Sequence, residues 1–475
     1  MHPLAMFHGP KLAKITDFYQ AYFDVVLGGQ MLNHLRELHE RYGPVVRIGP
    51  NTLHFANADA YNAIYANNSF TKYDWFYRYT FNHCYESSVA MTHIPSYKAR
   101  KASLSPLFSR SAIVKLEDVV QQKIDKLIKG LERHANGPGT IDIMFCFLST
   151  SFDIIIEYCF ATCLNTLDHP DFYHPMLLSL QKTLPGLWVQ KYFPFVTHLP
   201  EHFPSLVRRF APDLMAFDEC KQMLVEKIDR YVENPELLIA ADRSTIFHQL
   251  IVPDKHECPS KESLLHEGLI LMGAGSDTVA NACAIGTMHI LHKNGIRMKL
   301  VQELREAWPD VTLPMRYAEL EKLSYLSACI KESLRLSHGI VTPLPRVVGA
   351  SGANICGHTI TPKTVVATSS CFVHKDPGVF ENPDEFIPER WLQPDSKELE
   401  RYLVAFSKGP RMCIGINLAW CELYLILGNL FRKVNLTMTE ESAAAAHGLE
   451  DFQDAFVPHW HDKTCFQARV TSVSS

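Results

Sequence analysis

The strongest constraint on the fold is a long helical block that has β-like segments at both of its ends. Residues 58–336 are mainly of helical pattern, and Val114–Glu132 and Asp213–Val232 repeat their apolar residues with the 3.6-residue period of a helix. Short β-branched runs precede this block and follow it. A sheet would therefore be built from pieces distant in sequence. This pattern predicts one interleaved domain over residues 1–475, mainly α with a minor β region.

The β-like runs near the N-terminus predict a hairpin. Val45–Ile48 and Thr52–Phe55 flank the turn signal Gly49-Pro50-Asn51. A helix is predicted before them, over Asp17–Arg41. After Pro343 the chain changes character, because Gly and Pro separate several β-branched runs. These runs predict the remaining strands of the small sheet: Arg346–Val348, Asn354–Ile360 and Thr364–Ser370.

The composition favours a globular protein and excludes several classes. Of the 475 residues, 47% are apolar and 20% are charged, whereas a disordered chain would be less apolar. The net charge of -5 gives no indication of a nucleic-acid partner. Thirteen cysteines without C-x-x-C pairs argue against a disulfide framework and favour a reducing compartment. No uninterrupted apolar run of about 18 residues occurs, so we expect no membrane anchor in this chain.

The most specific motif is the loop Phe406–Gly415, F-S-K-G-P-R-M-C-I-G. A cysteine thiolate that ligates the iron of a porphyrin must approach a flat ring, so its neighbours must be small or tightly turned. Gly409 and Gly415 meet that need. Backbone N–H groups of the loop, and the N-terminus of a last helix predicted over Ile416–Phe431, can stabilise the anion of Cys413.

Two further side chains of the loop fit the same site. Arg411 suits one propionate of a haem, and Phe406 can pack beside the sulfur and keep water away. The alternative is a buried cysteine in an ordinary loop, which the five matched positions together disfavour. The pattern F-x-x-G-x-R-x-C-x-G resembles the haem-binding signature of the cytochrome P-450 family. The resemblance extends from about Tyr42 to the C-terminus. It implies a triangular, helix-rich single domain, haem b as cofactor and Cys413 as axial ligand of its iron.

Two motifs upstream of the loop resemble the family's buried ion-pair triad. Glu332 and Arg335 have the E-x-x-R spacing, and Phe386–Trp391 supplies Arg390. The resemblance implies a structural role, support of the loop on the haem side. A buried charge must be paired, and removal of one partner costs about 3–5 kcal/mol.

The sequence G-A-G-S-D-T inside the predicted helix Leu264–His292 resembles the family's oxygen-activation motif. A dinucleotide fingerprint is the alternative, but the third glycine is replaced by Thr278 and the preceding segment is not a strand. The resemblance implies that Ala274 and Gly275 leave room over the iron for O₂. It also implies catalytic roles, with Thr278 bonding to the bound oxygen or a water and Asp277 relaying protons.

Further cationic residues resemble propionate ligands. Arg346 follows the E-x-x-R helix at the distance of the family's propionate-binding arginine. Tyr97 and Lys101 lie in a segment similar to the early helix that also contacts the propionates. The family often has Trp or His where this chain has Tyr97, and Arg100 is an alternative source of the charge. A solvated basic helix face is the competing interpretation.

The opening block Tyr42–Asn51 resembles microsomal-type enzymes of filamentous fungi. That resemblance implies a monooxygenase that inserts one oxygen atom from O₂ into a lipophilic small molecule, such as a terpenoid or polyketide intermediate of secondary metabolism. It also implies NADPH-cytochrome P-450 reductase as partner, with Lys408 and Arg411 on a basic docking surface, and the cytosolic face of the endoplasmic reticulum with possible peripheral membrane contact. Five segments are expected to contact the substrate: Trp75–His93, Leu184–Phe210, Met272–Ala274, Gly339–Leu344 and Ala455–Val457.

Two other functions are compatible with a haem site. One is a haem-thiolate isomerase or dehydratase on the same fold, and the other is a non-enzymatic haem-binding sensor. Asp277 and Thr278 favour the monooxygenase, because scission of O₂ needs protons. A sensor should carry a signalling domain, and the sequence gives no sign of one.

Overall fold

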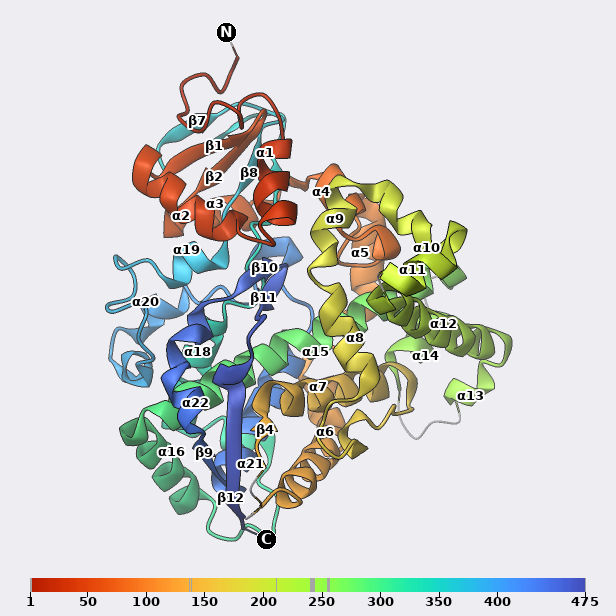
Figure 1. The fold of residues 1–475 in the computed structure, drawn as a ribbon, viewed down its shortest axis with the longest axis vertical. Helices are drawn as coiled ribbons and strands as arrows, with labels where there is room; N and C mark the ends of the chain where they lie inside the picture. The colour runs from red at the N-terminus through yellow and green to blue at the C-terminus, as the bar shows by residue number, and fades with distance from the viewer. Residues whose placement is uncertain are drawn as a thin grey trace.

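A computed structural model describes residues 2–474 except residues 136, 138, 211, 240–243 and 254–256. The main sheet lies at the end of the molecule that carries the N-terminus, and helices make up most of the rest (Figure 1). Its order is β1-β2-β8-β5-β3, so it joins strands from both ends of the chain. The strands are β1 (Val45–Gly49), β2 (Thr52–Phe55), β3 (Thr71–Lys72), β5 (Arg346–Val347) and β8 (Val365–Ala367).

The predicted hairpin β1–β2 is confirmed, and β2 pairs in parallel with β8. The smaller sheets are also assembled from distant segments or from hairpins. They are β4 (Ile141–Asp142), β12 (Gln467–Val473) and β9 (Val434–Met438) in one sheet, and the hairpins β6 (Ala353–Ile355)–β7 (His358–Ile360) and β10 (Gln453–Ala455)–β11 (Val457–His459).

The N-terminal helix predicted over Asp17–Arg41 is wrong as one element. The chain forms α1 (Phe18–Ala21), a π-helical turn (Tyr22–Val26) and α2 (Met31–Tyr42). Gly28 and Gly29, with φ of 67° and 76°, separate the pieces, because both adopt the left-handed conformation that ends a helix.

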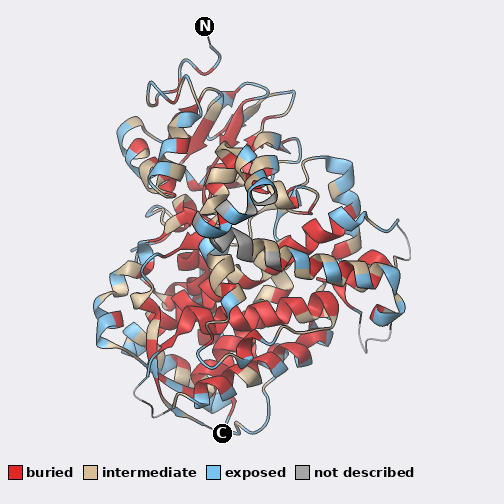
Figure 2. Cartoon of the chain, turned by 45° about the vertical axis from the view of Figure 1, so that its right-hand side comes forward, coloured by how far each residue is buried: buried red, intermediate tan, exposed pale blue. Residues whose placement is uncertain are grey.

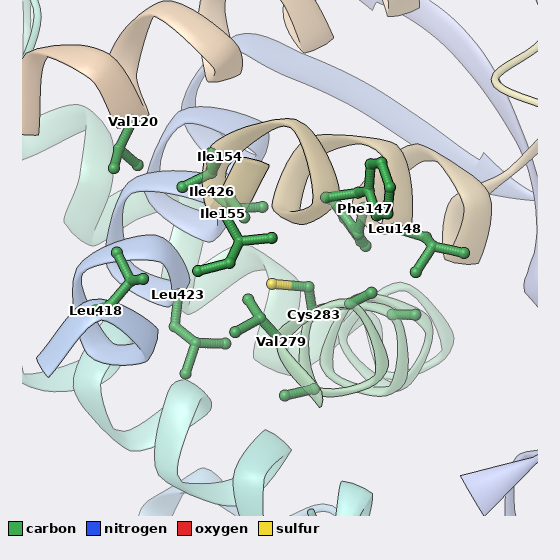
Figure 3. Packing of buried hydrophobic residues seen from close by; sticks show 14 of the residues in the cluster. Val120, Phe147, Leu148, Ile154, Ile155, Val279, Cys283, Leu418, Leu423 and Ile426 are labelled. Carbon is green, nitrogen blue, oxygen red and sulfur yellow. The ribbon is translucent and has the colours of Figure 1, made fainter. Parts of the chain in front are cut away.

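Five helices form the centre of the helical part. They are α6 (Arg110–Glu132), α7 (Ile143–Phe160), α15 (Lys261–His292), α18 (Ser324–Ser337) and α21 (Ile416–Lys433). Helix α15 packs against α7, α18 and α21, and buried residues concentrate on these elements (Figure 2). Figure 3 shows apolar side chains that fill the space between them: Ile154, Ile155, Val279, Cys283, Leu418, Leu423 and Ile426. Helix α7 is buried on almost every face, as its uniformly apolar sequence requires.

The remaining helices surround this centre. On the N-terminal side they are α3 (Ala58–Tyr65), α4 (Asp74–Thr80) and α5 (Ile94–Leu104). Between α7 and α15 they are α8 (Pro175–Thr183), α9 (Gly186–Tyr192), α10 (Leu199–His202), α11 (Pro204–Phe210), α12 (Pro212–Glu233), α13 (Glu236–Ile239) and α14 (Ile246–Ile251). After α15 they are α16 (Asn294–Ala307), α17 (Tyr317–Leu320), α19 (Ser370–His374), α20 (Ser396–Glu400) and α22 (Glu440–Ala444), so the predicted last helix, α21, is followed by one more short helix.

Two of the described helices are long and apolar enough, by length and composition alone, to cross a membrane. They are α7 and α15, although neither is an uninterrupted apolar run. Their apolar windows are 94% and 67% buried inside the protein, as is typical of core helices. Burial against other helices therefore accounts for their composition.

The contact between α15 and α18 generates a test of packing. A Cβ added at Gly286 would lie 2.0 Å from the Ser333 Oγ and 2.8 Å from its Cβ. We expect Gly286→Ala to lower the free energy of unfolding by about 1–3 kcal/mol, because the two helices must separate. Thermal unfolding followed by circular dichroism measures the loss.

Gly295→Ala is the matched control, because Gly295 lies in α16 and a Cβ there meets no atom within 4 Å. Alanine should stabilise this helix by up to about 1 kcal/mol. Equal midpoints for the two variants would contradict the proposed clash.

Candidate functional site

The loop that carries Cys413 is fixed by its own backbone and by α3. The Cys413 N–H donates to the Phe406 carbonyl at 2.9 Å, and the loop continues directly into α21. Gly409 has φ of 72°, and a Cβ there would lie 2.3 Å from the Tyr65 carbonyl oxygen. Glycine is therefore required at position 409. At Gly415 a Cβ would lie 3.8 Å from the Cys413 sulfur, an ordinary contact, so only a group placed against the sulfur would demand glycine there.

The Cys413 side chain opens into an internal cavity of about 240 Å³. Phe406, Ala274, Gly275 and Thr278 line the same cavity. Burial raises the pKa of the Cys413 thiol, while a hydrogen bond from the Gly415 backbone lowers it. Because burial dominates, the thiolate needs a further stabilising charge, which a metal ion can supply.

Four cationic side chains line this cavity: Lys72, Lys101, Arg346 and Arg411. Glu422, a carboxyl group whose pKa burial raises well above its usual value, is the one acidic residue among the described lining residues. Burial lowers the pKa of Arg411 to about 10, although the nearby Tyr97 raises it. Burial, followed by Arg411 and Arg346, lowers the pKa of Lys72 well below its usual value.

The buried Arg411 Nη1 atom has no hydrogen-bond partner in the protein. Buried guanidinium groups without a counter-charge are costly, so Arg346 and Arg411 favour an anionic group in the cavity. A flat, dianionic haem with its iron against a thiolate fits the cavity, its cations and its cysteine together.

Each cation is held in place by an aromatic side chain. Arg346 donates from Nη1 to the Tyr77 hydroxyl at 2.6 Å, and the Arg411 guanidinium stacks 3.3 Å from the centre of the Tyr97 ring. The register of β3 with β5 places Lys72 directly opposite Arg346. Sequence reasoning missed Lys72, because an isolated lysine in F-T-K-Y carries no signal until that strand pairing is known.

The prediction for the early helix needs correction. The Tyr97 hydroxyl and the Lys101 amine both donate to the Pro410 carbonyl at 2.9 Å, so these side chains tie α5 to the cysteine loop, although both also line the cavity. Arg100 is wrong as a source of charge for the cavity. Its guanidinium is buried in an ion pair with Glu267, at 2.6 Å.

Glu332, Arg335 and Arg390 are brought together as one buried cluster. Glu332 Oε1 lies 2.8 Å from Arg335 Nη2 and 3.1 Å from Arg390 Nε, and the Glu332 and Arg335 side chains are fully buried. The Ile387 N–H and the Trp391 indole N–H also donate to this carboxylate, each at 2.8 Å. The cluster therefore joins α18 to the segment that precedes the cysteine loop.

The motif on α15 lies beside the cavity. The Thr278 hydroxyl donates to the Ala274 carbonyl at 2.9 Å, and both residues line the cavity. Gly275 also lines it, but a Cβ there would lie 2.7 Å from Ile155 Cγ1 of α7. Helix packing therefore requires a glycine at position 275. This is a second reason for the small residue, beside the expected room for O₂.

A second cavity of about 390 Å³ adjoins the first. Six residues line both cavities: Val89, Ile270, Ala274, Thr278, Ile340 and Phe456. All five segments expected to contact the substrate contribute residues to its wall. Sequence reasoning missed the contributions of α8 and α12, among them Leu180, Gln181 and Phe217, because their amphipathic patterns do not show which face meets a cavity.

Asp277 lines this second cavity, and it is not among the residues that line the cavity of Cys413. Burial raises the pKa of Asp277 to about 6, while a hydrogen bond from Gln181 and the charge of Lys463 lower it. The carboxyl group can therefore exchange a proton near neutral pH.

The fold and the cavity of Cys413 define a haem-thiolate enzyme. The family model for Cytochrome P450 matches residues 10–446. Cytochrome P450 monooxygenase sol6 of Alternaria solani is 32% identical over 436 residues, covering 90% of this chain and 92% of that protein. Cytochrome P450 monooxygenase sdnE of Sordaria araneosa is 33% identical, with 95% and 90% covered, and tryptophan 6-hydroxylase fscE of Fusarium equiseti is 31% identical, with 95% and 89% covered.

This chain belongs to the cytochrome P450 family. It is a haem-dependent monooxygenase, and it is similar to fungal enzymes of secondary metabolism. The family implies haem, O₂, an organic substrate and a redox partner. The predicted family, helix-rich fold class and reaction class are confirmed.

The Glu332 cluster yields a test of its structural role. We expect Glu332→Gln to lower the free energy of unfolding by about 3–5 kcal/mol, because it leaves two buried guanidinium groups without a counter-charge. Urea unfolding followed by tryptophan fluorescence measures the change. The control is Glu400→Gln. Glu400 is the exposed ion-pair partner of Lys331, which lies on α18 beside Glu332, and its loss should lower the free energy of unfolding by less than about 1 kcal/mol. Similar losses for both variants would refute the special role of Glu332.

Proposed function

We propose that this chain inserts one oxygen atom of O₂ into a lipophilic small molecule, such as a terpenoid or polyketide intermediate of fungal secondary metabolism. The observation that carries the proposal is the junction of the two cavities. Cys413 and the cations Lys72, Lys101, Arg346 and Arg411 line one cavity, and a mainly apolar cavity adjoins it through Ala274 and Thr278. Residues 1–475 would act as one catalytic domain.

The chain's own residues hold the cofactor and supply protons. When bound, haem supplies the activation of O₂ and the transfer of one oxygen atom. Arg346 and Arg411 would bind its carboxylates, and Cys413 would ligate its iron with Phe406 shielding the sulfur. The Thr278 hydroxyl, which donates to the Ala274 carbonyl, lies at the junction of the cavities and could accept a hydrogen bond there, and the Asp277 carboxyl would supply a proton from the larger cavity.

The wall of the larger cavity supports a lipophilic substrate. Leucine, isoleucine, valine and phenylalanine side chains make up nearly half of the lining residues, and they come from several helices and loops. A volume of about 390 Å³ suits a small molecule, and a few polar side chains such as Gln181 and Thr197 could orient it. Burial of apolar groups would supply most of the binding free energy.

Electrons would come from NADPH through NADPH-cytochrome P-450 reductase. A basic docking surface was predicted around Lys408 and Arg411. Arg411 does not belong to it, because its guanidinium stacks on Tyr97 beside the cavity. Lys408, Lys98 and Lys115 remain as cations for an acidic partner.

We also propose that the protein contacts the cytosolic face of the endoplasmic reticulum membrane. Exposed apolar side chains gather at the N-terminus and beside it: Leu12, Ile15, Phe18, Tyr22, Val26 and Phe195. The Phe18 and Phe193 rings lie 6.4 Å apart, and Phe193 and Phe195 lie 6.3 Å apart, so two distant segments form one surface. Such a surface is typical of a membrane-contacting face.

The haem-thiolate bond has a spectroscopic test. The purified protein, reduced and saturated with carbon monoxide, should show the strongly red-shifted Soret band of a thiolate ligand. Cys413→His should abolish the shift while haem remains bound, because a nitrogen ligand replaces the sulfur. Cys371→Ser, at a buried cysteine away from the cavity lining, is the control and should keep the shift. An unshifted band in the unaltered protein would refute the proposal.

Membrane contact is tested by sedimentation with vesicles of phosphatidylcholine and phosphatidylinositol. We expect Phe18→Asp with Phe195→Asp to weaken binding at least about tenfold, because each buried phenylalanine contributes roughly 1.5–3 kcal/mol. Leu313→Asp is the control, since Leu313 is 64% exposed, as Phe18 is, and lies on another part of the chain. Unchanged binding of the double variant would exclude this surface.

A further inference from the structure

Three oxidisable aromatic side chains form a line that begins beside the cysteine loop. Phe406 lines the cavity of Cys413, and the centre of its ring lies 5.9 Å from that of Trp420 on α21. Trp420 and Tyr424, about one turn apart on that helix, have ring centres 5.8 Å apart. The Tyr424 ring centre lies 5.8 Å from that of Tyr317 on α17. Each ring is therefore close enough to the next for an electron to pass between them.

The outer end of this line reaches solvent through an ion pair. Arg110 Nη1 of α6 donates to the Tyr317 hydroxyl at 3.3 Å, and the guanidinium lies 5.2 Å from the centre of the Tyr317 ring. Arg110 also pairs with Glu321, and the Arg110 side chain is 53% exposed. Tyr317 and Tyr424 are themselves buried. The line thus connects the interior cavity with the surface between α6 and α17.

The order of the three residues favours outward movement of positive charge. A tyrosine that releases its phenolic proton is easier to oxidise than a tryptophan. Burial raises the pKa of Tyr317 to about 12, although Arg110 lowers it, so the phenol is protonated at neutral pH and must lose that proton on oxidation. The Glu321 carboxylate acts on the same phenol and can pass its proton to water. Charge that enters the line at Trp420 therefore settles on Tyr317.

We propose that Trp420, Tyr424 and Tyr317 carry oxidising equivalents away from the cavity of Cys413 when peroxide reaches the haem-loaded protein without substrate, and that thiols at the surface consume them. In each event one electron moves from Tyr317 through Tyr424 and Trp420 to the haem site, and the phenolic proton of Tyr317 goes to water. A thiol then returns one electron and one proton to the Tyr317 radical. Two such events convert H₂O₂ and two thiols into two H₂O and one disulfide, so atoms and electrons balance. This activity is additional to oxygen insertion and requires only that haem is bound at Cys413.

The test variant is Trp420→Phe, which keeps a ring in the line but one that is much harder to oxidise. The haem-loaded protein is mixed with H₂O₂ without substrate and frozen, and electron paramagnetic resonance records organic radicals. We expect a tyrosyl radical in the unaltered protein and its loss in Trp420→Phe. The variant should also lose glutathione-dependent consumption of H₂O₂, and its Soret band should bleach faster, because oxidising equivalents then stay beside the cavity.

A second variant tests the order of the line independently of the first. Tyr424→Phe keeps Trp420 and interrupts the path behind it. We expect the tyrosyl signal to be replaced by a tryptophanyl radical, which has a different spectrum. A tyrosyl signal that persists in either variant would overturn the proposal, because it would place the radical on tyrosines that line the cavity itself: Tyr61, Tyr65, Tyr77 and Tyr97.

The matched control is Trp308→Phe. Trp308 is also buried, and its carbonyl accepts a hydrogen bond from Arg432 of α21 at 2.7 Å, but its ring belongs to none of the three ring pairs of the line. This variant should keep the tyrosyl radical and the thiol-dependent reaction. Absence of a tyrosyl radical in the unaltered protein would overturn the line alone, provided that its carbon monoxide spectrum is red-shifted. An unshifted spectrum of the same preparation would overturn the proposed function and the line with it.

Discussion

The cluster of cationic side chains around the cavity of Cys413 is the constraint on which the site depends. Lys72, Arg346 and Arg411 come from three separate parts of the sequence, yet their side chains meet where protein carboxylates are nearly absent. Such a cluster is unfavourable by itself, because like charges repel and burial removes water. The cavity is thus built to be completed by an anionic cofactor, and cofactor binding should contribute to the stability of the fold.

The cysteine loop depends on supports that do not touch the cofactor. The Glu332 carboxylate accepts hydrogen bonds from Arg335 of α18 and from the segment around Arg390. The Tyr97 hydroxyl and the Lys101 amine donate to the Pro410 carbonyl. These contacts fix both flanks of the loop. The sulfur can therefore keep its position although burial opposes its ionisation.

Sequence reasoning reached the helix-rich class, the hairpin, the cysteine loop and the grouping of Glu332 with Arg335 and Arg390. The helix-rich class and the hairpin depend on local periodicity and turn signals, which a single sequence displays. The grouping of Glu332 with Arg335 and Arg390 was implied by the resemblance to the cytochrome P-450 family. It failed at Asp17–Arg41, where the paired glycines act as a helix end, and at Arg100, whose partner Glu267 is distant in sequence. Lys72 and Gln181 were also beyond its reach, because strand register and helix orientation assign their partners.

The parallel pairing of β2 with β8 has a consequence for synthesis in the cell. Strand β2 ends at Phe55 and its neighbour β8 begins at Val365. The edge of the N-terminal hairpin therefore has no partner strand until roughly 300 further residues have been synthesised. At ribosomal speeds that delay lasts about 15–60 s. Over that interval the nascent chain exposes an open strand edge, which makes it a natural client for chaperones and vulnerable to aggregation when they are scarce.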